Sequence, residues 1–380
     1  MKKKRYKILF TGGGTGGHIT PIIAIVRELR RVSKEEIQFY FMGPKDEIGE
    51  VLLSQEGIKI KRVMAGKIRR YFGFKSFFQN IFDILFKIPI GVFQAYIYIF
   101  FLNPNVIFCK GGFGSIPGVI AGKLLFAPVF LHESDVSPGM ANRFLSNFSL
   151  ENFVSFPKTE YFPLKKMILV GNPIRREVLE GSKEEAKRTF KISSDKPVVL
   201  ILGGSQGAQR INDKILEIIA DLLKNFEVIH QCGDKNYQEV KNGAKVMLIR
   251  HREVEGRYHL YPFLKEPELA RAYAVADFVV SRAGSGTIFE IAAAEKPSIL
   301  IPLPESAQDH QVKNAYAYAQ NGACEVIEEV NFTSRFFLER LKYFFSDEEE
   351  MEKIKKAIKE FAKPQAAKII ANYLIEYLKS

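Results

Sequence analysis

The sequence of 380 residues has no tryptophan and only three cysteines, Cys109, Cys232 and Cys324. The cysteines lie far apart and without metal-ligand spacing, so the sequence indicates neither a disulfide framework nor a zinc module, and it suits a reducing compartment. An Asp-x-Asp pair is also absent. The sequence therefore does not indicate a metal site, and we expect no cofactor.

A signal peptide and a clear membrane span are also missing. The basic segment Met1–Arg5 precedes only a short apolar run, not the long one of a signal peptide. The apolar stretch Ile88–Leu102 has about 15 residues, short of the ~20 that a span requires, and Pro89 and Gln94 weaken it further. Aromatic residues are dense from residue 67 to residue 102, with basic residues among them: Lys67, Arg69, Arg70, Lys75 and Lys87. This segment is either a core helix or a patch that lies on an anionic bilayer.

The charge balance points to an anionic partner. The net charge is +12 and the pI is about 9.3, which favours nucleic acid, a phosphorylated substrate or an anionic membrane. The basic residues form no arm and no nucleic-acid motif is present, so we expect no nucleic acid. A basic surface without a partner remains the alternative. A chain of this length exceeds one core, so we expect two domains.

A strand, a glycine turn and a helix are predicted near the start of the chain. Tyr6–Phe10 is apolar and predicts a buried strand, Thr11–His18 is rich in glycine, and the next residues predict a helix with Pro21 near its first turn. A turn of this kind directs free backbone N–H groups and the positive end of the helix dipole at one point. The usual occupant of such a point is a phosphate.

The spacing of Gly12, Gly14 and Gly17 also fits a dinucleotide site. That site needs an acidic residue after the second strand, but the second predicted strand, Ile37–Phe41, is followed by Met42–Pro44. The sequence therefore disfavours NAD, and a tight turn without a ligand remains open.

Three more glycine turns follow predicted strands, at Gly111, Gly203 and Gly284. Alternating strands and helices predict an α/β fold with doubly wound parallel sheets. The pattern repeats in the second half, so we expect two Rossmann-like domains facing each other across a cleft, with ligands at the carboxyl ends of the strands. Because residues 158–173 are rich in proline and turn residues, we expect domains at 1–165 and 166–363 and a final helix at 364–380.

In this order, the motifs resemble the MurG family of bacterial cell-wall glycosyltransferases. The resemblance covers nearly the whole chain and rests on Gly13–His18, Lys110–Phe113, His132–Asp135 with Pro138–Gly139, Gly171–Arg175, Gly203–Ala208, Arg282–Glu290, and Asp309–Gln311 with Asn314–Ala315. It implies a GT-B fold whose last helix crosses back to the first domain. It also implies an inverting transfer of N-acetylglucosamine from UDP-N-acetylglucosamine to undecaprenyl-diphosphate-N-acetylmuramoyl-pentapeptide, by a peripheral enzyme at the cytoplasmic face of the membrane.

The resemblance also implies which residues bind substrate. Glu290 would bind the ribose, Gln311 the sugar, and the backbone of Leu264 the uracil. Ser205, Ser285, Gly286 and Thr287 would bind the diphosphate, and Arg175 would also face the nucleotide. The remaining expected binding residues are Thr15, Gly16, Gly17, Asp135 and Gln206. Some family members carry Gln-Asn where this chain has Ser134-Asp135, which leaves the role of Asp135 open.

His18 is our candidate general base. Imidazole suits proton transfer near neutral pH, and the start of a helix favours the neutral ring. His18 could instead position the acceptor diphosphate or cap the helix, with Asp135 as the base. His132 is expected to be a structural hydrogen-bonding residue. Two alternative functions stay open: another GT-B enzyme, such as a glycolipid synthase or a UDP-N-acetylglucosamine 2-epimerase, and a non-catalytic nucleotide-sugar-binding partner.

Overall fold

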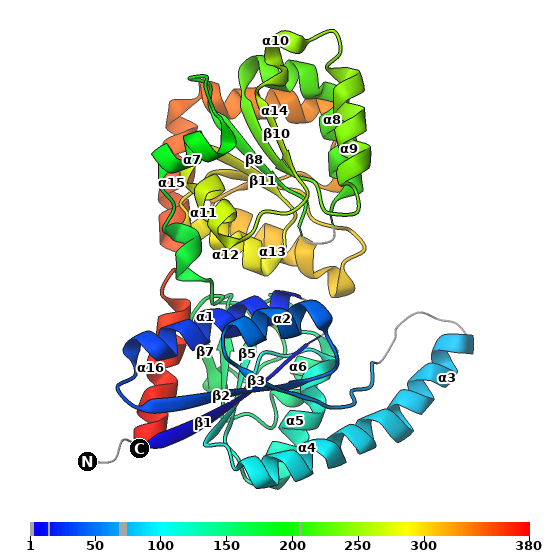
Figure 1. Ribbon diagram of the computed structural model, residues 1–380, viewed down its shortest axis with the longest axis vertical. Coiled ribbons are helices and arrows are strands. Elements are labelled where there is room, and N and C mark those ends of the chain that lie inside the picture. The colour runs from blue at the N-terminus through cyan, green and yellow to red at the C-terminus, as the bar shows by residue number, and fades with distance from the viewer. Residues whose placement is uncertain (1–3, 14–15, 68–73, 205–206) are drawn as a thin grey trace. The chain divides into compact units, whose positions relative to one another are not determined.

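The computed structural model describes residues 4–13, 16–67, 74–204 and 207–380. The chain divides into two compact units, Met1–Arg175 with Gln365–Ser380, and Arg176–Pro364. Six residues singled out above lie outside the described residues: Gly14, Thr15, Arg69, Arg70, Ser205 and Gln206. We describe each unit separately as the first and the second domain (Figure 1).

The first domain is built on a seven-stranded parallel sheet in the order β3-β2-β1-β4-β5-β6-β7. Its strands are β1 (Arg5–Thr11), β2 (Glu36–Gly43), β3 (Lys59–Arg62), β4 (Val106–Cys109), β5 (Val129–Glu133), β6 (Glu151–Val154) and β7 (Met167–Leu169). Because side chains alternate between the two faces of a strand, Ile8 and Phe10 enter the core on one face and Leu9 enters the core on the other.

Helices cover both faces of this sheet (Figure 1). They are α1 (Gly16–Val32), α2 (Glu47–Gln55), α3 (Phe74–Phe82), α4 (Ile88–Leu102), α5 (Ile116–Leu124), α6 (Met140–Leu145) and α16 (Ala366–Lys379), with a π-helical segment η1 (Asp83–Lys87) and short 3-10 turns η2 (Phe113–Ser115) and η3 (Leu164–Lys166). Helices α1 and α16 pack side by side on one face, and α4, α5 and α6 contribute to the core on the other. The helix at the end of the sequence thus completes the first domain.

Two predictions about the first domain are wrong. Helix α1 begins at Gly16, so Pro21 lies inside it and not in its first turn; proline lacks the N–H that would bond to the carbonyl of Gly17, and the helix continues without that bond. The expected linker around residue 165 belongs to the first domain, because β7 pairs with β6. A three-residue edge strand is too short to give a pattern.

Helices α3 and α4 join through η1 into one long helix that leads away from the first domain (Figure 1). Residues Ser76–Leu102 of this helix, 27 in number, are long and apolar enough by length and composition to cross a membrane. The sequence predicted only about half of this length. Pro89 does not end the helix, because it lies directly after the π-helical segment, where the wider spacing of hydrogen bonds tolerates a missing N–H.

The second domain has a six-stranded parallel sheet in the order β10-β9-β8-β11-β12-β13. Its strands are β8 (Val198–Leu202), β9 (Glu227–Gln231), β10 (Tyr258–Tyr261), β11 (Phe278–Ser281), β12 (Ser298–Leu300) and β13 (Glu325–Val326). The helices are α7 (Lys183–Phe190), α8 (Gln209–Asn225), α9 (Tyr237–Met247), α10 (Arg252–Glu255), α11 (Glu266–Val275), α12 (Ser285–Ala293), α13 (His310–Ala319), α14 (Ser334–Ser346) and α15 (Glu348–Phe361), with 3-10 turns at Arg176–Leu179, Ala307–Asp309 and Glu329–Asn331. Strand β8, fully apolar and buried, lies at the centre of its core.

Candidate functional site

The order of strands in each sheet reverses next to a glycine turn. In the first domain the reversal lies between β1 and β4, and in the second between β8 and β11. Open parallel sheets bind ligands at this point, outside the carboxyl ends of the strands. The predicted site residues that the structure describes follow these strand ends or their neighbours.

The glycines at the first reversal are required by the backbone. Gly13 has φ +134°, Gly111 +99° and Gly112 +81°, a region that side chains rarely occupy. A Cβ on Gly112 would also lie 2.7 Å from the carbonyl oxygen of Gly13. The two turns can therefore lie this close together only because these positions are glycines.

His18 lies in the first turn of α1, half-buried, after the exposed Gly16 and Gly17. A Cβ on Gly112 would be 3.1 Å from Cε1 and 3.2 Å from Nε2 of His18, so the imidazole lies against the second glycine turn. The first turn of α1 contains no acidic residue, so no carboxylate there offsets the positive end of its dipole. The structure thus brings the imidazole and the anion-binding end of a helix together.

A buried charged cluster lies beside this turn, and the sequence assigned no role to two of its members. Lys110 follows β4 and is 2% exposed; its ammonium donates to the hydroxyl of Ser134. Glu133 ends β5 and is 3% exposed. Its Oε2 accepts from Asn142 Nδ2 at 2.7 Å, and its Oε1 accepts from the backbone N–H of Asp135 at 2.9 Å. We call Lys110, Glu133 and Asp135 the charge cluster.

Two members of the charge cluster, Lys110 and Glu133, have shifted pKa values. Burial lowers the pKa of Lys110 to about 8, against the attraction of Glu133 and Asp135. Burial, and then repulsion from Asp135, raises the pKa of Glu133 to about 7. Burial and the positive charge of Lys110 hold the pKa of His132 well below its usual range, and its Nε2 is 3.0 Å from the carbonyl oxygen of Gly171. His132 is therefore neutral, and its contact with Gly171 is the kind of hydrogen bond expected of a structural residue.

In the second domain, the predicted diphosphate and ribose residues share the start of α12. Ser285 is buried in its first turn, Gly286 is exposed and Thr287 half-buried. Glu290 follows one turn later, half-buried, and its Oε2 accepts from the Tyr273 hydroxyl at 3.5 Å. The backbone N–H groups of this first turn are the natural ligands of a phosphate.

The predicted uracil contact, Leu264, is buried after β10, and its backbone N–H donates to Gln231 Oε1 at 3.0 Å. Gln231 ends β9, and its side chain also donates to the carbonyl of Gly204 at 3.4 Å. Gln231 therefore joins the glycine turn after β8 to the expected base site. The sequence reasoning missed this residue, since an amide at the end of a strand carries no motif.

Two further predicted residues lie in separate domains, Gln311 in the second and Arg175 in the first. Gln311 is in the first turn of α13, and its Oε1 accepts from the backbone N–H of Leu303 at 3.0 Å. The residues before it, Gln308 and Asp309, have φ +60° and +55°, and such backbone strain is typical of ligand-binding segments. Arg175, half-buried, is the last residue of the first segment of the first domain.

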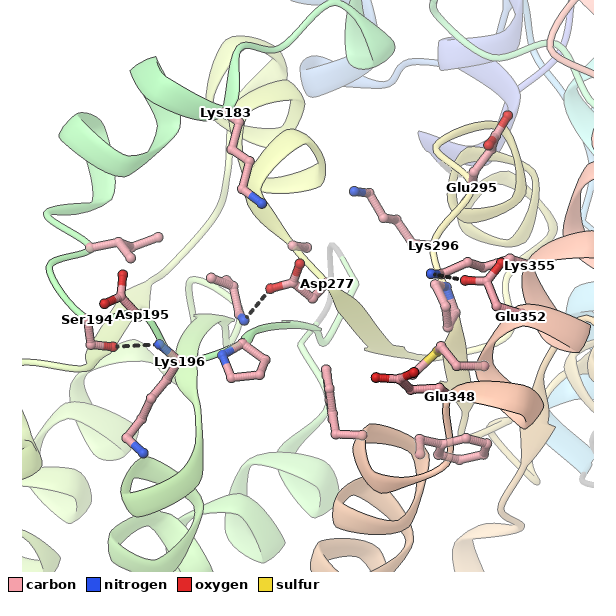
Figure 2. Close-up of a pocket in the computed structure, with 18 of the residues that line it drawn as sticks. Lys183, Ser194, Asp195, Lys196, Asp277, Glu295, Lys296, Glu348, Glu352 and Lys355 are labelled. Atoms are coloured by element: carbon pink, nitrogen blue, oxygen red, sulfur yellow. Dashed lines mark hydrogen bonds and ion pairs between the residues drawn. The ribbon is translucent and has the colours of Figure 1, made fainter.

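A pocket of about 700 Å³ in the second domain is a separate feature (Figure 2). It lies at the amino ends of β8, β11 and β12, on the edge opposite to the glycine turn, and none of the predicted site residues that the structure describes lines it. Lys183 and Lys296 extend into the same space from α7 and from the residues before β12 (Figure 2). The formal charges of its lining balance, with five lysines and five carboxylates: Lys183, Lys187, Lys196, Lys296 and Lys355, and Asp195, Asp277, Glu295, Glu348 and Glu352.

Two parallel-sheet domains, each with a glycine turn at its strand reversal, make up the GT-B fold, and family models identify the chain as a glycosyltransferase. Residues 8–154 match the glycosyltransferase family 28 N-terminal domain, and residues 198–370 match the C-terminal domain of that family. The crystal structure of Acinetobacter baumannii MurG has the same fold, with a TM-score of 0.74 at 24% identity over 98% of this chain and 99% of that chain.

Two curated relatives match over nearly their whole length. The UDP-N-acetylglucosamine--N-acetylmuramyl-(pentapeptide) pyrophosphoryl-undecaprenol N-acetylglucosamine transferase of Clostridium tetani is 37% identical over 92% of both chains. The corresponding transferase 2 of Bacillus cereus is 37% identical over 97% of this chain and 99% of its own. The chain belongs to this family of N-acetylglucosamine transferases.

Proposed function

We propose that the protein transfers N-acetylglucosamine from UDP-N-acetylglucosamine to the 4-hydroxyl of the muramoyl sugar in undecaprenyl-diphosphate-N-acetylmuramoyl-pentapeptide. The acceptor oxygen forms a bond to the anomeric carbon from the face opposite to the diphosphate. The bond from that carbon to the diphosphate oxygen breaks, UDP leaves with the electron pair, and the configuration inverts. The observation that carries this proposal is the name of the relatives that match over nearly their full length.

In this proposal the second domain binds the donor. The N-terminal turn of α12, with Ser285, Gly286 and Thr287, stabilises the negative charge that develops on the UDP diphosphate. Glu290 accepts hydrogen bonds from the ribose hydroxyls, and Gln311 contacts the sugar. The backbone at Leu264 faces the uracil. Its N–H already donates to Gln231, so the carbonyl of Leu264 is the group to which the base N–H donates.

The first domain binds the acceptor, and His18 takes the proton of the attacking hydroxyl. The imidazole lies in the first turn of α1, at the positive end of the helix dipole. A protonated ring is disfavoured there, so the ring stays neutral and can accept a proton. Gly16 and Gly17 present backbone N–H groups to the acceptor diphosphate. Asp135, at the end of the charge cluster, is the alternative base.

The long helix brings the first domain to an anionic membrane surface. Its second half cannot leave the protein, because Gly91, Ala95, Ile99 and Leu102 of α4 are buried, at a spacing that forms one face. The opposite face exposes three phenylalanines, which we call the α4 aromatics: Phe93 at 66%, Phe100 at 61% and Phe101 at 79%. A helix with one face in a protein core and aromatic side chains on the other lies in the plane of the interface. The net charge of +12 favours anionic headgroups.

One incubation tests the proposed function. The protein is mixed with UDP-N-acetylglucosamine labelled in the sugar and with the lipid-linked acceptor, and the products are identified by mass. We expect UDP together with an acceptor that has gained one N-acetylglucosamine, and only when both substrates are present. UDP released without the acceptor would indicate a 2-epimerase, and binding without any turnover would indicate a non-catalytic binding protein.

A further inference from the structure

Lys110 is a buried cation that the reaction above does not use. It lies directly after β4, where the order of strands reverses, and its backbone N–H donates to the carbonyl of Thr11 at 2.8 Å. A Cβ on Gly12 would lie 3.6 Å from Cβ of Lys110 and 3.7 Å from Cβ of His18. Lys110 is thus placed next to the first glycine turn and to the candidate base.

The charge cluster has a composition that stability alone does not explain. Lys110 and Glu133 are buried and Asp135 is half-buried. Removing an ammonium and a carboxylate from water costs several kcal/mol per ion, roughly, and their attraction rarely returns more than that. An apolar side chain after β4 would continue a strand whose four residues are all buried at no such cost. The cluster is also fixed by polar contacts on either side, through Asn142 and through the Ser134 hydroxyl, which donates to Asn172 at 3.3 Å.

We propose that Lys110 is a positioning residue for the transfer reaction proposed above. Its ammonium balances the carboxylates of Glu133 and Asp135, and the net charge of the three sets how strongly this edge of the first domain binds the anionic diphosphate of the lipid acceptor. Lys110 acts through Asp135 and the segment 133–135 and does not itself touch the substrate, because it is almost fully buried.

The pKa values of Lys110 and Glu133 predict how acceptor affinity changes with pH. With Glu133 protonated, the ammonium and the Asp135 carboxylate cancel. Because the pKa of Glu133 is raised to about 7 and that of Lys110 lowered to about 8, raising the pH first ionises Glu133 and then neutralises Lys110, and both steps make the cluster more negative. Among the described groups near Lys110, two stay neutral: His132, whose pKa is lowered, and Cys109, whose pKa burial raises to about 11. His18 also lies beside Lys110, across Gly12, so each variant is compared with wild type at the same pH. Acceptor affinity should therefore fall as the pH rises through about 7 to 8.

The test measures KM for the acceptor and for the donor between pH 6 and 9, roughly the range in which the two groups titrate, in four proteins: wild type, Lys110→Met, Asp135→Asn and the double variant. Lys110→Met should raise the acceptor KM about tenfold or more at each pH, because it leaves an uncompensated carboxylate, and should leave the donor KM within about twofold. Asp135→Asn removes the repulsion that raises the pKa of Glu133, so the rise of the acceptor KM should start at a lower pH. The double variant should recover most of the loss in Lys110→Met, since the two changes couple.

Lys123→Met is the matched control, because Lys123 is an exposed lysine on α5, and it should change neither KM. An acceptor KM in Lys110→Met equal to that of wild type, or a double variant worse than both single variants, would overturn the proposal. If Lys110→Met does not fold, Asp135→Asn decides: an acceptor KM with the wild-type pH profile overturns it. A wild type that transfers no sugar overturns the proposed function together with this inference, whereas normal transfer with unchanged variants overturns the inference alone.

Discussion

Glu290 gives the sharpest test of the donor site. A carboxylate that accepts from the two ribose hydroxyls makes charge-assisted hydrogen bonds worth about 1.5–3 kcal/mol in total. At about 1.4 kcal/mol per tenfold, Glu290→Ala should weaken UDP binding by about 10- to 100-fold. The same change removes an acceptor from the buried Tyr273 hydroxyl, but the 3.5 Å contact is long, so we expect the free energy of unfolding to fall by no more than about 1 kcal/mol. Glu290→Gln keeps an acceptor oxygen without the charge, so its affinity for UDP should lie between those of wild type and Glu290→Ala.

Calorimetric titration with UDP and with 2′-deoxy-UDP separates a ribose contact from a general loss of binding. Wild type should prefer UDP, and Glu290→Ala should lose that preference because it lacks the group that reads the 2′-hydroxyl. Glu239→Ala, an exposed glutamate on α9, is the control and should bind as wild type does. Unchanged UDP affinity in Glu290→Ala, or a full preference for UDP over the deoxy nucleotide, would refute the assignment.

Three other predictions concern the first domain. His18→Ala should lower turnover by about 10²–10⁴, leave donor affinity unchanged and remove the acidic limb of the pH–rate profile; a variant that keeps this limb would make His18 a binding residue. Replacing the α4 aromatics by serine should abolish sedimentation with anionic vesicles, since each phenylalanine loses about 1.5–3 kcal/mol of apolar burial, while Phe336→Ser in the second domain should not; equal sedimentation would place the membrane surface elsewhere. Gly112→Ala should cost about 1–3 kcal/mol in denaturant unfolding because of its backbone angles, and Gly256→Ala, where nothing lies within 4 Å of the new Cβ, should cost less; equal costs would contradict the strain.

Much of the fold follows from the sequence because its central strands are buried on both faces. Strand β8 and the segment Ile8–Phe10 of β1 are continuous apolar runs, and the following glycine turns mark where the strands end. The exceptions are physically clear. Strands β7 and β13, with three and two residues, are too short to show a recognisable pattern of apolar residues. Helix α1 starts with two glycines, which have a low helix propensity. Its first turn therefore depends on packing against the sheet.

The site was predictable where a residue belongs to a local motif and not where it depends on a partner across the sheet. Ser285 and Glu290 share one helix, so their spacing is visible in the sequence. The contact of Lys110 with Ser134 joins residues 24 apart, and it exists only because β4 pairs with β5. A lysine between a buried strand and two glycines was nevertheless a sign, since its ammonium needs a partner that the sequence alone does not identify.

The return of α16 to the first domain affects how the chain acquires its structure during translation. Ile370, Ala371 and Leu374 are buried in the core that β1 and α1 begin, so the first domain cannot close that core until residues 365–380 have left the ribosome. The second domain is continuous in sequence and can fold earlier. The usual order, in which the N-terminal domain folds first, is therefore reversed, and the nascent first domain exposes apolar surface for the longest time.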